Sequence, residues 1–189
     1  MELLSPAGNL TALREAVDNG ADTVYIGFRD DTNARQFPGL NFTPQQAGKG
    51  VEYARKQGVK VAVAINSYVQ AGGWQRWRGA VDEAGRIGAD AVILADLGLI
   101  EYAAENWPQL ARHLSVQASA TTPESLNFYQ QRYGVTRAVL PRVLSIQQVE
   151  ALAKETQVEL EVFGFGSLCV MAEGRCLLSS YATGESPNT

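Results

Sequence analysis

Residues 20–27 read GADTVYIG, and residues 88–94 repeat the pattern as GADAVIL. In each copy a glycine stands where a preceding helix would end, and a short apolar run rich in β-formers follows the aspartate. Capping of a helix by glycine would by itself account for the first residue of the repeat. The repeat also fits a chain that twice leaves an outer helix and enters the floor of a barrel as a strand.

Seven short apolar runs with strand character are spread along the chain. They cover residues 2–4, 23–26, 59–65, 91–94, 113–116, 137–140 and 158–163. Segments with helical spacing lie between them, for example residues 10–17 and 149–153. This alternation predicts parallel strands joined by crossover helices.

Two α/β architectures are compatible with that order. A doubly wound sheet often carries a glycine-rich phosphate loop after its first strand, but residues 5–9 read SPAGN and lack it. We therefore predict a TIM-like (β/α) barrel. A typical barrel takes about 250 residues, so we expect an incomplete one, with about seven βα units and the eighth strand missing.

We expect residues 1–163 to form the barrel portion and residues 164–189 to form a truncated, cysteine-containing segment. The 46% hydrophobic and 19% charged residues indicate a globular protein. A net charge of −4 without a basic stripe disfavours nucleic acid as a partner. The sequence starts without a secretory signal and has no apolar run near the roughly 18 residues of a membrane helix. We therefore expect a cytoplasmic protein without a membrane span.

Reactive groups in a barrel come from the C-terminal ends of the strands. Asn66, Asp96 and Gln117 follow successive predicted strands and are candidate catalytic residues, although capping of the next helix explains Asp96 as well or better. Arg35, in an unusually long loop, and Arg142 could together clamp a carboxylate of the substrate. The alternative is that both arginines form salt bridges at the rim.

The chain has one histidine and two cysteines. His113 belongs to a strand start at the barrel floor, which argues against a serine-type triad and against a zinc protease motif. Cys169 and Cys176 are soft ligands suited to an iron–sulfur cluster or to zinc, and either site normally takes about four protein ligands. The remaining two ligands would then lie beyond this chain. A structural disulfide is the weaker alternative in a reducing compartment.

Residues 161–179 read EVFGFGSLCVMAEGRCLLS. Together with LSPAGN at 4–9 and the block at 20–27, this stretch resembles the signature of the collagenase-like peptidase family, so the resemblance spans the whole chain. Residues 30–35, 39–42 and 183–189 are similar to one subgroup of that family, whose members act in anaerobic ubiquinone biosynthesis.

The resemblance implies oxygen-independent hydroxylation of a ubiquinone ring precursor, a prenylated phenol, with prephenate as oxygen donor. It also implies a [4Fe-4S] cluster with four cysteine ligands, of which two correspond to Cys169 and Cys176, and a heterodimer with a homologous second subunit. Other members of the family are RNA-modifying hydroxylases, and the family name suggests a protease. Both functions stay open as alternatives, although the acidic composition counts against RNA.

Overall fold

The computed structural model describes residues 1–166 and Tyr181. Its seven strands form one sheet in sequence order, and every neighbouring pair is parallel. The strands are β1 (Leu4–Pro6), β2 (Thr23–Gly27), β3 (Lys60–Ile65), β4 (Ala91–Leu94), β5 (Ala111–Leu114), β6 (Val135–Val139) and β7 (Glu159–Glu161). The predicted βαβα order is thereby confirmed.

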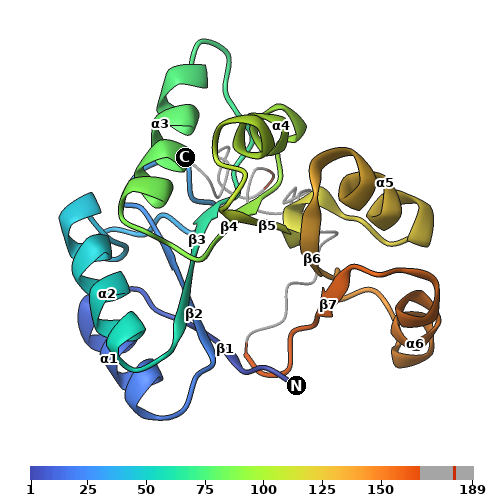
Figure 1. Ribbon diagram of the computed structural model, residues 1–189, viewed down its shortest axis with the longest axis horizontal. Helices are drawn as coiled ribbons and strands as arrows, with labels where there is room; N and C mark the ends of the chain where they lie inside the picture. Colours follow the sequence, from blue (N-terminus) through green and yellow to red (C-terminus); the bar gives the residue numbers. More distant parts are fainter. Residues whose placement is uncertain (167–180, 182–189) are drawn as a thin grey trace.

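Six helices connect these strands. They are α1 (Leu10–Asp18), α2 (Pro44–Lys56), α3 (Trp74–Arg86), α4 (Leu97–Asn106), α5 (Pro123–Tyr133) and α6 (Ile146–Glu155). The sheet curls with the helices on its outer side, and β1 and β7 face each other across an opening (Figure 1). In the described part of the chain no strand pairs with the free edges of β1 and β7. Over residues 1–166 the fold is therefore the predicted (β/α) barrel lacking one strand.

Side chains alternate between two layers along each strand, as the pleat requires. In β3, Val61, Val63 and Ile65 point outward and are fully buried against the helices. Ala62 and Ala64 point inward, where they form a smaller cluster with residues of β2, β4 and β5. The main core thus lies between sheet and helices, while the cluster inside the barrel is built mostly of alanines, with Ile93 and Tyr25 as its large members.

The Gly-Ala-Asp repeat does more than end two helices. Gly20 and Gly88 adopt the left-handed backbone that favours glycine, with φ of +93° and +74°. The Asp22 carboxylate accepts a hydrogen bond of 2.7 Å from the Leu3 N–H, and the Asp90 carboxylate accepts one of 2.8 Å from the Val61 N–H. Each aspartate therefore ties its own strand to the start of the preceding strand.

The fifth and sixth strands start two residues earlier than the apolar runs predicted. The Arg112 side chain donates to backbone carbonyls, including those of Leu110 and Tyr133, at 2.9 and 2.8 Å, so a charged residue fits inside β5. The strand ends before Ser115 because the Ser115 hydroxyl accepts from the Gln117 N–H and starts a 3₁₀ turn, Val116–Ala118. Side-chain hydrogen bonds to the backbone thus set both ends of β5.

None of the helices described here is long and apolar enough to cross a membrane. The predicted division between residues 1–163 and 164–189 stays a prediction, because most of the second segment lies outside the described residues.

Candidate functional site

The long loop that follows β2 is fixed by its own polar groups. A bridge between Phe28 and Phe42 closes its base. The Arg29 guanidinium donates to the carbonyls of Leu40 and Asn41, at 3.2 and 3.1 Å. The loop is therefore an ordered platform at the C-terminal ends of the strands.

Arg35 is presented by that platform. Asn33, which is buried, accepts a hydrogen bond of 3.0 Å from the Arg35 N–H, and the Asn41 amide donates to the Arg35 carbonyl at 2.9 Å. Asn33 packs so closely over Gly27 that a Cβ added there would lie 2.0 Å from its Nδ2 atom. Glycine at the end of β2 is thus required for the loop to fold over the strand.

The two predicted arginines act on one side chain, the Tyr25 phenol inside the barrel. Burial raises the pKa of Tyr25, the positive charge of Arg35 and that of Arg142 lower it, and Glu161 raises it. Arg35 follows the C-terminal end of β2 and Arg142 follows that of β6, and because these strands run parallel, both arginines belong to the same end of the barrel. The Arg142 guanidinium also lies over the Phe163 ring, 3.4 Å from its centroid.

The Asn66 side chain and the backbone N–H of Gln117 both contact a third residue, the Ser115 hydroxyl. The Asn66 amide oxygen accepts from the Ala34 N–H at 3.0 Å, and its nitrogen lies 3.5 Å from the Ser115 hydroxyl. That hydroxyl also accepts from the Gln117 N–H at 3.2 Å. Asn66 therefore links the Arg35 loop to the turn that carries Gln117.

Asp96 caps helix α4, the alternative that the sequence favoured. One carboxylate oxygen accepts from the Leu99 N–H at 3.1 Å, and the other accepts from the Val69 N–H at 3.4 Å. Both oxygens are thus engaged by backbone donors, and the loop after β3 is held against the start of α4.

Sequence reasoning missed Tyr25 and Ser115 as members of this site. Tyr25 is part of the GADTVYIG block, where it is the one large side chain with a hydroxyl at an inward position of β2. Ser115 follows a strand directly, as Asn66 does, but a serine in that position reads as a helix cap.

Cys169 and Cys176 lie outside the described residues, so their role as metal ligands stays a prediction. Among residues 1–166 no group of three or more His, Cys, Asp or Glu side chains could hold a metal ion. Thiolates suit iron chemically, and the two cysteines would supply half of the four ligands that a cluster takes. His113 is buried in β5 and lines a cavity with the first residues of β2 and β3, at the end of the barrel opposite the arginines.

The profile of Peptidase family U32 matches residues 8–189 of the chain. An uncharacterized protease of Methanocaldococcus jannaschii is 37% identical over 196 residues, which cover 100% of this chain and 46% of that protein. The tRNA hydroxylation protein P of Escherichia coli is 35% identical over 188 residues, covering 99% of this chain and 41% of that protein. The chain thus spans less than half the length of these relatives.

A solved structure of similar fold is the U32 peptidase Mk0906, with a TM-score of 0.70, 21% identity, and coverage of 86% of this chain and 68% of that one. At that identity the likeness shows the fold alone. The profile match and the relatives together confirm the family that the cysteine stretch indicated, and the chain belongs to Peptidase family U32.

Proposed function

We propose that the protein is an oxygen-independent hydroxylase of the UbiU subgroup, which hydroxylates the ring of a prenylated phenol in ubiquinone biosynthesis. The observation that carries the hydroxylase class is the 35% identity, over nearly the whole chain, to a protein named for tRNA hydroxylation. The similarity of residues 30–35, 39–42 and 183–189 to the subgroup supports the choice of substrate. The proposal includes a UbiV-like homologous subunit as heterodimer partner and a cytoplasmic location.

A [4Fe-4S] cluster fits this proposal. Cys169 and Cys176 would hold it together with two ligands from outside the chain, and when bound it would supply the redox chemistry that side chains cannot.

The described residues would bind and orient the reactants. Prephenate carries two carboxylates, and Arg35 and Arg142 offer two guanidiniums at the C-terminal ends of the strands. Both positive charges also act on the Tyr25 phenol, whose pKa they lower. Asn66 and Gln117, joined through Ser115, would orient the ring to be hydroxylated. Asp96 would hold the neighbouring loop in place. Its carboxylate would also accept or donate protons during hydroxylation.

The clamp is tested with alanine variants of the full-length protein. Loss of one charge-assisted contact costs about 1.5 to 3 kcal/mol, so Arg35→Ala and Arg142→Ala should each need roughly tenfold to hundredfold more donor for turnover. Their iron content should not change. Arg78→Ala and Arg132→Ala are the controls, since these guanidiniums lie over Tyr102 and Tyr133 on the outer helices. Normal turnover of both clamp variants at limiting donor would contradict the assignment.

Hydroxylation of RNA is the second candidate, favoured by the name of the Escherichia coli relative. The net charge of −4 counts against it. A deletion strain grown without oxygen separates ubiquinone hydroxylation from RNA hydroxylation. Our proposal predicts that this strain loses ubiquinone and keeps its hydroxylated nucleosides. Mass spectrometry of lipids and of digested RNA measures both. Loss of a hydroxylated nucleoside with normal ubiquinone would favour RNA.

A protease finds no support in the described residues. The chain's one histidine lies at the floor of the barrel, and its ring Nδ1 has no hydrogen-bond partner among them.

A further inference from the structure

A cavity lies at the opposite end of the barrel from the arginines, at the N-terminal ends of the strands. Its volume is about 320 Å³, near the lower end of the range for small-molecule sites. Bulky Val, Ile and Leu side chains usually fill the interior of such barrels. Here Ala62, Ala91 and Ala111 line it instead, and these small side chains leave the space open.

Two buried polar groups of this cavity lack partners. The Thr23 hydroxyl and the His113 Nδ1 form no hydrogen bond within the described part of the chain, and these residues are only 3% and 9% exposed. Buried polar atoms without partners are rare in folded proteins and call for an explanation. Burial holds the pKa of His113 at about 4, so the ring is neutral at pH 7 and its free nitrogen can accept a hydrogen bond.

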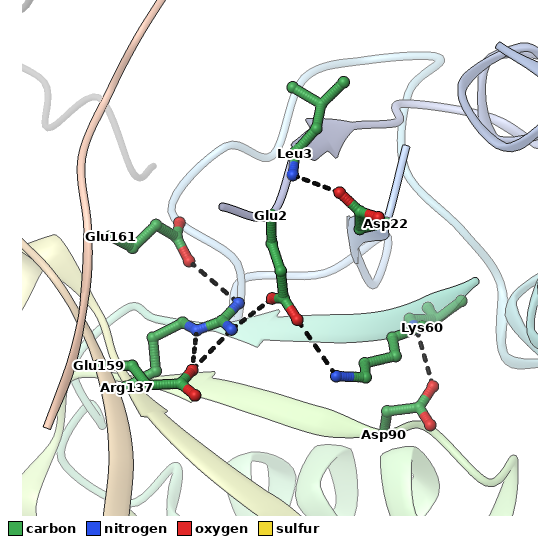
Figure 2. A network of polar contacts seen from close by, with 9 residues as sticks. Glu2, Leu3, Asp22, Lys60, Asp90, Arg137, Glu159 and Glu161 are labelled. Atoms are coloured by element: carbon green, nitrogen blue, oxygen red, sulfur yellow. Dashed lines mark hydrogen bonds and ion pairs between the residues drawn. The ribbon is translucent and has the colours of Figure 1, made fainter. Parts of the chain in front are cut away.

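The cations around the cavity are already paired. Arg137 contacts Glu2 and contacts Glu159 at 2.7 Å, with Glu161 4.0 Å away, and Lys60 lies 3.3 Å from Glu2 (Figure 2). Three carboxylates therefore share two positive charges, so this network does not attract an anion.

The Asp90 carboxylate differs from those three. It also lines the cavity, and it is exposed to solvent. Its one hydrogen bond is to the Val61 N–H, and no ion pair joins it to a cation among residues 1–166. The wall thus offers two neutral acceptors and one unneutralised carboxylate, a set that suits a donor-rich cation.

We propose that this cavity binds a small organic ammonium ion, with the Thr23 hydroxyl and His113 Nδ1 as hydrogen-bond acceptors and Asp90 as the counter-charge. Ordered water is the competing occupant of any polar cavity. This cavity is separate from the proposed hydroxylation site. Ammonium binding here therefore does not depend on the proposed function.

His113 provides a direct reporter, because it is the only histidine in the 189-residue chain. Its ring resonances are followed by NMR at pH 7 while ethanolamine is added, with ethylene glycol and acetate as neutral and anionic probes of similar size. We expect a saturable shift with ethanolamine and none with the other two. Equal shifts with ethylene glycol, or no shift with ethanolamine, would show a cavity filled by water or neutral solutes and would overturn the proposal.

Variants test the acceptors. Asp90→Asn keeps an acceptor for the Val61 N–H but removes the charge, and it should weaken ethanolamine binding about tenfold. Asp22→Asn is the matched control, because Asp22 makes the same kind of bond to the Leu3 N–H and does not line the cavity. Thr23→Val should weaken binding several-fold with its melting temperature little changed. Unchanged affinity in both Asp90→Asn and Thr23→Val, or equal loss in Asp22→Asn, would refute the assignment.

Discussion

Protonation of His113 should make the protein less stable in mild acid. Desolvation by burial is the main cause of its low pKa, and the charge of Arg137 adds to it, giving about 4 against an ordinary 6.5. The unfolded chain therefore binds a proton between these values while the folded chain does not, and stability falls as the pH drops through this window. From pH 7 to pH 5 the linkage amounts to about 2 kcal/mol.

The measurement is urea unfolding followed by tryptophan fluorescence, since the chain has three tryptophans. The free energy of unfolding is compared at pH 7 and pH 5 for the natural chain and for His113→Gln, which cannot titrate. The natural chain should lose about 2 kcal/mol, whereas the variant should lose little.

One nearby carboxyl works in the opposite direction. Burial raises the pKa of Glu161, so the folded chain takes up that proton earlier and gains relative stability as the pH falls. Removing His113 should therefore leave a flat or slightly rising profile toward pH 5. If His113→Gln keeps the full loss of stability, the titration of His113 is not its cause and the reasoning is wrong.

Three further predictions concern the end of β2, the cap of α4 and the two cysteines. Gly27→Ala should destabilise the chain by about 1 to 3 kcal/mol in urea unfolding, because its methyl group would overlap Asn33, and an unchanged midpoint would contradict that packing. Asp96→Ala should cost about 1 kcal/mol through loss of the cap, whereas Asp96→Asn should cost less. In the full-length protein purified without oxygen, Cys169→Ala or Cys176→Ala should lose iron and visible absorbance, and a retained cluster in either variant would exclude that ligand.

Local sequence pattern was sufficient for the class of fold. The apolar runs alternate with helical spacing, and the Gly-Ala-Asp repeat marks two entries into strands, because glycine and aspartate satisfy backbone requirements within a few residues. The positions of Asp96 and Arg35 could be read in the same way, as residues following strands. The capping role of Asp96 was also foreseeable, since it depends on residues only three positions apart.

Only the tertiary structure decided which of these residues belong together. The charges of both Arg35 and Arg142 lower the pKa of Tyr25, although more than one hundred residues separate the two arginines in sequence. No local sequence pattern predicts that these three residues lie near one another. The cavity at the floor is likewise invisible in sequence, since an alanine in a strand looks like any buried residue until its neighbours also prove small. The sequence by itself determined the elements and their order through short-range backbone chemistry. The curl of the sheet decided the sites, because it brings side chains from distant strands into one interior.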